Sequence, residues 1–140
     1  MVKIDGGGEG VSAIAVSALR AQQARMRIIA ENMANSGSTA ATPGGLPYRR
    51  QAPVFAVAEV GGGHGVQMKS AQPDPTPFRK EYAPGHPAAD PAGYVLMPNV
   101  DGLIEAMDMK DAMRAYEANL NVLENQDAMD KSTLSLLKPG

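Results

Sequence analysis

The sequence contains no cysteine and no tryptophan, and its aromatic side chains are limited to four Tyr and two Phe among 140 residues. Without cysteine there is no disulfide, no thiolate metal site and no thiol nucleophile. With so few aromatic residues, and with 15 Gly and 11 Pro, the chain has little material for a large closed core. We therefore expect apolar stripes on individual elements rather than one globular interior.

Long apolar runs and a strong excess of charge are also missing. No segment approaches the roughly eighteen consecutive apolar residues that a membrane-spanning helix needs, so no direct membrane insertion is expected. The net charge of −2 argues against nucleic acid or an anionic membrane surface as a partner. Val11–Leu19 has the length of a secretory signal core, but Asp5 and Glu9 precede it beside a single Lys3. We therefore expect no cleaved signal peptide.

The motifs of metal and phosphate sites are absent or incomplete. His64 and His86 are the only two histidines, and they stand in separate turn-rich segments without a second ligand at helical spacing. Residues 63–70 end like a phosphate-binding loop, but Met68 occupies the position that requires Gly before Lys69. We therefore predict no metal and no cofactor.

One acidic group resembles a set of catalytic carboxylates. Glu105, Asp108 and Asp111 fall on one face of a predicted helix, with Lys110 and Arg114 nearby. Carboxylates interleaved with basic residues are more typical of a solvated helix face than of acid–base catalysis. We therefore predict a solvated face here and no catalytic residue.

The last third of the chain, Asn99–Leu137, has the strongest periodic pattern. Seam positions recur at alternating steps of three and four, which is a heptad pattern. Asn99 is the candidate N-cap, Asp101 suits the first turn, and Lys138-Pro139 ends a helix of roughly 57 Å. The seam consists of Ala106, Met109, Met113, Tyr116, Leu120, Leu123, Asp127, Asp130, Leu134 and Leu137.

A second amphipathic helix is predicted from Val11 to Asn35, with Ser12 as N-cap and Gly37 available for a left-handed C-cap. At roughly 37 Å it would leave some 20 Å of the longer helix uncovered in an antiparallel pair. An uncovered apolar seam indicates a partner surface. The stripe of this helix consists of Ala15, Leu19, Gln22, Met26, Ile29 and Met33.

Between the helices, residues 38–98 are rich in turn residues and carry short β-prone runs. Tyr48–Val60 and Val66–Ser70 flank a Gly-rich loop and predict a hairpin, and Phe78–Tyr82 is a further short candidate strand. We therefore predict a mainly α protein, in which two long terminal helices form a coiled-coil-like assembly domain around a small irregular β-rich insert.

The predicted regions are an N-terminal arm that is flexible or ordered by contacts (1–10), the N-terminal helix (11–37), the insert (38–98) and the C-terminal helix (99–140). Asp127 and Asp130 interrupt the seam, and we favour pairing with Arg on the other terminal helix over simple solvent exposure. The candidate partners are Arg20, Arg25 and Arg27. The predicted assembly interface consists of Leu19, Met26, Ile29, Met33, Met109, Met113, Tyr116, Leu120, Leu123, Asp127, Asp130, Leu134 and Leu137.

Several segments resemble a known family. Residues 19–35, which end in Glu-Asn-Met-Ala-Asn, resemble the N-terminal helix motif of the flagellar axial proteins, which build the rod, hook and filament junctions. Further segments are similar to the proximal-rod members of that family, although residues 1–10 are more polar and Gly-rich than in relatives. These segments are residues 43–50, 74–78, 82–90, 93–100 and 114–119.

The resemblance implies a structural subunit of the proximal rod, which is part of the torque-transmitting drive shaft. It implies polymerisation through paired terminal helices in the periplasm, after export by the flagellar type III apparatus. The implied partners are other copies of the chain and other rod proteins. Two other readings of the residues stay open: a soluble coiled-coil adaptor outside the flagellum, and a small binding module that uses the loops around His64 and His86.

Overall fold

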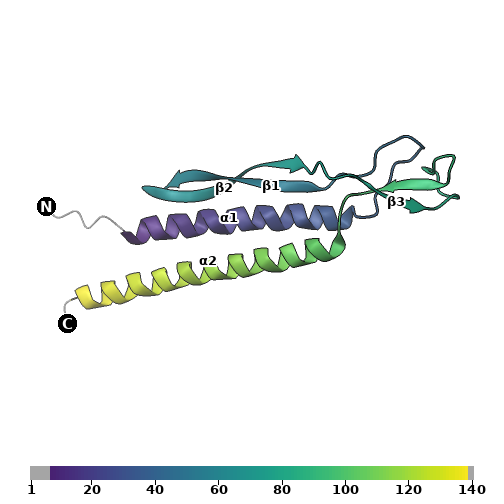
Figure 1. Cartoon of the computed structure of the whole chain (residues 1–140). Helices are drawn as coiled ribbons and strands as arrows, with labels where there is room; N and C mark the ends of the chain where they lie inside the picture. The colour runs from purple at the N-terminus through teal and green to yellow at the C-terminus, as the bar shows by residue number, and fades with distance from the viewer. Residues whose placement is uncertain (1–6, 139–140) are drawn as a thin grey trace. The chain divides into compact units, whose positions relative to one another are not determined.

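The computed structural model describes residues 7–138. Two helices enclose four strands in sequence (Figure 1). The elements are α1 (Gly7–Ala34), β1 (Gln51–Val60), β2 (Gly63–Pro73), β3 (Arg79–Tyr82), β4 (Tyr94–Met97) and α2 (Gly102–Leu137). The predicted fold class, two long terminal helices with a β insert between them, is confirmed. The β1–β2 hairpin is longer than expected, because β2 extends on both sides of the predicted strand Val66–Ser70.

The chain divides into two compact units, each built from segments that are distant in sequence. Unit 1 comprises Met1–Arg25, Phe55–Lys69 and Asp111–Gly140, of which residues 7–25, 55–69 and 111–138 are described. Unit 2 comprises Met26–Val54 and Ser70–Lys110. Both long helices and the hairpin therefore contribute residues to each unit.

In unit 1, the hairpin turn lies against the first part of α1 (Figure 1). Gly61 and Gly62 form the turn with φ of 56° and 77°, which favour glycine. A Cβ at Gly65 would lie 2.4 Å from the Ser17 Oγ, so the strand approaches this closely only because the position has no side chain. The Ser17 hydroxyl accepts a hydrogen bond from the Val66 N–H at 3.2 Å. Within unit 1, this hydrogen bond therefore lies where the hairpin approaches α1 closely at Gly65.

In unit 2, β3 and β4 form an antiparallel pair, with register running from Arg79↔Met97 to Tyr82↔Tyr94. The rings of Tyr82 and Tyr94 meet edge to face, with centroids 5.4 Å apart. The buried side chains of this unit come from α1, β4 and the start of α2, and they include two polar ones, Asn32 and Glu105. Core positions of unit 2 are therefore partly polar.

The helix ends differ from the predicted ones. α1 begins at Gly7, four residues before Val11, and Gly37 is not among the positive-φ glycines of the described chain, so the predicted left-handed cap is wrong. Asn35 ends α1 by donating from its side chain to the Glu31 carbonyl at 2.9 Å. At α2, Asp101 is the N-cap, because its Oδ1 accepts from the Leu103 N–H at 3.0 Å.

Candidate functional site

Four charged side chains meet in unit 2, and we call them the Arg50 cluster: Arg50, Asp74, Glu105 and Asp108. The Arg50 guanidinium donates from Nε to the Glu105 Oε1, lies with Nη1 3.2 Å from the Asp74 Oδ2, and lies with Nη2 3.5 Å from the Asp108 Oδ2. Glu105 is completely buried. One guanidinium therefore joins the start of β1, the segment after β2 and the first turns of α2.

Asn99 reinforces the same junction through both ends of its amide. Its Oδ1 accepts from the Arg50 N–H at 2.7 Å, and its Nδ2 donates to the carbonyls of Asp74 at 3.1 Å and Thr76 at 2.9 Å. Arg49 donates to the Asp74 carbonyl at 2.7 Å and stacks over the Phe78 ring at 4.1 Å. The predicted role of Asn99 as N-cap is wrong, because its side chain is committed to these loop contacts.

Asn32 on α1 forms a second polar anchor. It binds Gln51, the residue that follows Arg50 in the chain. Its Oδ1 accepts from the Tyr48 hydroxyl at 2.8 Å and from the Gln51 N–H at 2.9 Å, and its Nδ2 donates to the Gln51 carbonyl at 2.8 Å. The side chain is completely buried, and both its oxygen and its nitrogen are hydrogen-bonded. It therefore fixes the start of β1 on α1.

The protonation of these groups follows from their contacts. Hydrogen bonds from Thr76, and then from Arg50, lower the pKa of the Asp74 carboxyl despite its partial burial. Burial alone would lower the pKa of Arg50, but the hydrogen bond and charge of Glu105, followed by those of Asp74, outweigh it and raise the pKa. Burial, and then the charges of Glu31 and Glu105, raises the pKa of the Tyr48 phenol, so it stays available as a donor to Asn32.

The sequence missed the Arg50 cluster. The prediction of a solvated face is wrong for Glu105, because its partner Arg50 lies 55 positions away in the chain and no local pattern connects them. Asp108 is half-buried and shares that partner, whereas Asp111 is exposed as predicted. The only available signal was the clustering of Arg49-Arg50 beside a strand start.

The predicted interface residues of α1 separate into two groups. Leu19 and Ile29 are buried inside the chain and Met26 is half-buried, so these three contribute to packing within a unit. Met33 is exposed. On α1, therefore, most of the predicted stripe is already covered by the chain itself.

The predicted seam of α2 is only partly covered. Four of its residues are half-buried, namely Met109, Tyr116, Leu120 and Leu123. The remainder is exposed, namely Ala106, Met113, Asp127, Asp130, Leu134 and Leu137. The most deeply buried positions are Glu105 and Ala112, so the covered face lies one residue away from the predicted seam at Ala106 and Met113.

The two seam aspartates have partners on their own helix. Asp127 Oδ2 lies 3.1 Å from the Lys131 Nζ, and Asp130 Oδ1 accepts from the Gln126 Nε2 at 3.0 Å. Among the described residues, neither pairs with the arginines of α1. Within the single chain, therefore, both carboxylates face water, and pairing with Arg20, Arg25 or Arg27 across a packed assembly stays a prediction.

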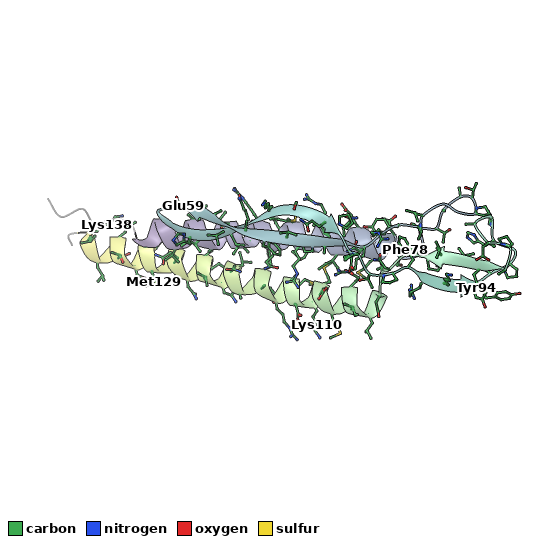
Figure 2. All side chains as sticks on the ribbon, turned by 45° about the horizontal axis from the view of Figure 1, so that its top comes forward. Glu59, Phe78, Tyr94, Lys110, Met129 and Lys138 are labelled. Carbon is green, nitrogen blue, oxygen red and sulfur yellow. The ribbon has the colours of Figure 1, made fainter. Side chains whose placement is uncertain are left out.

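Two features of α2 leave apolar surface uncovered. Every residue from 127 to 138 is exposed, including Met129 and Lys138 (Figure 2). A second set of exposed apolar side chains, which the sequence analysis missed, lies on the sides of α2 away from the buried Glu105 and Ala112. We call it the outer stripe, and its exposed members are Leu103, Ile104, Met107, Val122, Met129 and Leu136.

Other site classes find little support in the described residues. No group of three or more acidic or histidine side chains there is arranged to hold a metal ion. Among the same residues, no helix combines the length and hydropathy needed to cross a membrane. His86 has two local contacts: its Nδ1 accepts from the Ala88 N–H at 3.0 Å, and its Nε2 lies 3.3 Å from the Thr39 Oγ1. These contacts of His86 therefore stabilise the loop that contains it.

Comparison with known proteins agrees with this picture of a structural chain. Residues 92–136 match the family model described as flagellar basal body rod FlgEFG protein C-terminal. The flagellar basal-body rod protein FlgC of Agrobacterium fabrum is 46% identical over 129 residues, which cover 91% of this chain and 93% of that protein. FlgC of Salmonella typhimurium is 42% identical (88% and 92% covered), and FlgC of Borreliella burgdorferi is 38% identical (89% and 94% covered).

The matched region includes Asn99, Asp101 and Glu105, which are the part of the junction at the start of α2. The identity extends over both terminal helices and the insert, as the fold requires of a single structural unit. Together with an anchored β insert and a largely uncovered terminal helix, these similarities show that the chain belongs to the FlgC family of flagellar basal-body rod proteins, which are structural, non-enzymatic subunits of the rod.

Proposed function

We propose that this chain enters the proximal rod by burying the exposed surface of α2 against neighbouring copies and other rod proteins. The observation that carries this proposal is the uninterrupted exposure of residues 127–138, which include Met129, Leu134, Leu136 and Leu137. Exposed apolar side chains at this density mark an interaction surface. Each would contribute about 1.5–3 kcal/mol if an assembly buried it completely.

We further propose that the chain travels through the flagellar type III export apparatus into the periplasm without losing a signal peptide. The apolar run Val11–Leu19 supports this, because it is part of α1 and its Ala15 and Leu19 are buried. Cleavage after this run would remove part of the packing in unit 1. Paired terminal helices would then form the wall of the torque-transmitting shaft.

The test is removal of residues 131–140 in a strain that depends on this chain for motility. We expect normal expression and export but failed rod assembly and loss of motility, because the uncovered end of α2 is gone. Two point variants then separate the faces of the helix: Leu134→Glu with Leu137→Glu alters the predicted seam, and Leu136→Glu alters the outer stripe. A motile strain with the truncated chain at normal levels would contradict the proposal.

A further inference from the structure

Glu105 leaves one hydrogen-bonding position open in a buried place. Its Oε1 accepts from Arg50, whereas its Oε2 is buried and has no hydrogen-bond partner among the described residues. A buried carboxylate oxygen without a donor is costly, and native structures rarely retain one. This oxygen can therefore accept a hydrogen bond from a group that enters beside it.

A cavity of about 380 Å³ lies beside Glu105 in unit 2. Its lining is partly polar and partly apolar. The polar part includes the carboxylates of Asp74, Asp101 and Glu105, and the apolar part includes Pro77, Val100 and Ile104. An aliphatic stem with a charged head matches such a lining, as lysine and arginine side chains do.

The charge of this region favours a cation. Among the residues that line the cavity, Asp74, Asp101 and Glu105 give three carboxylates, against which the guanidinium groups of Arg50 and Arg79 give two positive charges. Arg50 is already paired with Asp74, Glu105 and Asp108, and Arg79 donates to the Val100 carbonyl at 3.3 Å. The remaining formal charge is negative. No metal-binding group of side chains occurs among the described residues, which favours an organic cation.

We propose that this cavity receives a lysine or arginine side chain of a neighbouring rod subunit, with an N–H of that side chain donating to the Glu105 Oε2. The proposal rests on the proposed function, because it needs a neighbour in the rod. The exposed apolar side chains of Leu103 (73%) and Ile104 (52%) lie at the first turn of α2, and Ile104 itself lines the cavity. A protein surface would cover them, whereas a free small amine would leave them in water.

The first test is site-specific photo-cross-linking in assembled basal bodies. A photoreactive amino acid replaces Ile104 in one strain and Leu136 in another, and mass spectrometry identifies the cross-linked peptides. We expect position 104 to capture a segment of a rod protein that contains Lys or Arg close to the cross-linked residue. A cross-link to a rod segment without a basic residue would overturn the cavity proposal.

The comparison of the two positions separates the two proposals. If position 136 captures rod proteins and position 104 captures none, the cavity proposal fails and the proposed function stands. If position 104 alone captures a basic rod segment, the cavity proposal stands and the role assigned to the end of α2 fails. If neither position captures a rod protein, both proposals fail.

The second test measures recognition of the cation by the purified full-length chain. The probes are N-acetyl-arginine amide and N-acetyl-lysine amide, with the neutral N-acetyl-citrulline amide as control, and the readout is the methyl NMR signals of Val100 and Ile104. We expect saturable shifts with the two cations only. Glu105→Gln should weaken binding by about tenfold or more, since a charged hydrogen bond is lost.

Glu105→Gln also alters the ion pair with Arg50, so a second pair of variants keeps the test independent of folding. Pro77 lines the cavity but is exposed and lies outside the Arg50 cluster. Pro77→Lys places a competing cation at the rim, and Pro77→Gln is the neutral control. We expect binding to be lost in the first and retained in the second. Equal binding by both variants, or binding of the citrulline probe as tight as that of the cations, would overturn the proposal.

Discussion

Asn32 shows how one buried side chain can hold α1 to the segment that leads into β1. Its amide satisfies the Tyr48 hydroxyl and both backbone groups of Gln51. Asn32→Ala removes three hydrogen bonds and leaves buried partners unpaired, so we expect a loss of roughly 2–4 kcal/mol in the free energy of unfolding. Urea unfolding followed by circular dichroism measures this loss.

The control for Asn32 lies one turn further along the chain. Asn35 is half-buried and makes only local contacts, with Glu31 and Ser38, among the described residues. Asn35→Ala should therefore cost under about 1 kcal/mol, and Tyr48→Phe, which removes one of the three bonds of Asn32, should cost about 1 kcal/mol. If both asparagine variants lose the same free energy of unfolding, the hydrogen bonds of Asn32 do not stabilise the fold more than local ones.

Asp74 makes the stability of unit 2 sensitive to acid. Its pKa is lowered in the folded chain, first by the Thr76 hydrogen bonds and then by Arg50. Its stabilisation is therefore complete above the unfolded pKa of about 3.9 and is lost as pH falls through the lower folded pKa. Thr76→Ala should raise the folded pKa, which carboxyl-carbon NMR titration measures directly.

The matching stability measurement uses the Asp74→Asn variant. This side chain cannot ionise, so the free energy of unfolding should lose the part of its pH dependence that arises at this residue. Urea unfolding at several pH values below 5 compares the two chains. If Thr76→Ala leaves the titration of Asp74 unchanged, the Thr76 hydrogen bonds do not cause the shift.

Single-residue roles were the least predictable from the sequence. Glu105 had the sequence neighbourhood of a solvated helix face, and only the return of Arg50 from a distant segment makes it a buried ion pair. Asn99 was expected at the helix start on its cap propensity, but Asp101 has the same propensity and takes that place. Tertiary contacts decide between such equivalent candidates.

At the scale of elements, periodicity predicted both helices but not which face the chain covers. α2 carries apolar side chains on two sides, the predicted seam and the outer stripe, and a single sequence does not say which one packs internally. The structure buries Ala112 next to the predicted Met113. A small side chain such as that of Ala112 allows neighbouring segments to pack closely on α2, whereas the larger Met113 is left exposed.

The seam aspartates of α2 suggest a test at the same scale. Asp127 and Asp130 are exposed and paired only on their own helix, and exposed pairs contribute little to stability. Asp127→Leu with Asp130→Leu adds apolar surface to a seam that already exposes Leu134. We expect increased helicity and self-association of the purified chain, measured by sedimentation velocity, with reduced incorporation into rods.

The matched control for this double variant is Glu117→Leu with Glu124→Leu. These two acids are also exposed on α2 but lie beside the predicted seam and not in it, so the control makes the same change in charge next to the seam. It should self-associate less. If the seam variant stays monomeric and assembles as well as the parent chain, the two carboxylates are bystanders in solvent.

For the whole molecule, the sequence predicted the order of helix, β insert and helix, but not the division into two units. That division depends on where the hairpin meets α1, and its close approach at Gly65 has no periodic signal. Family resemblance supplied the function, because the segments that carry it extend over nearly the whole chain. The Arg50 cluster and Asn32, both in unit 2, explain physically why such segments contain buried polar residues.

The two units also predict how the isolated chain exchanges its amide hydrogens. Unit 2 holds a completely buried polar network at Asn32 and Glu105, together with Val95 and Val100, whereas residues 127–138 of unit 1 are exposed throughout. Because local opening follows burial, the amides of unit 2 should exchange slowly and those of Asp127–Leu137 at least about tenfold faster. Hydrogen exchange read by mass spectrometry, on a sample shown to be monomeric by sedimentation, measures this difference. Strong protection that extends evenly to Leu137 in such a monomer would mean that α2 is stable without a partner, and its exposed end would then need no neighbour to order it.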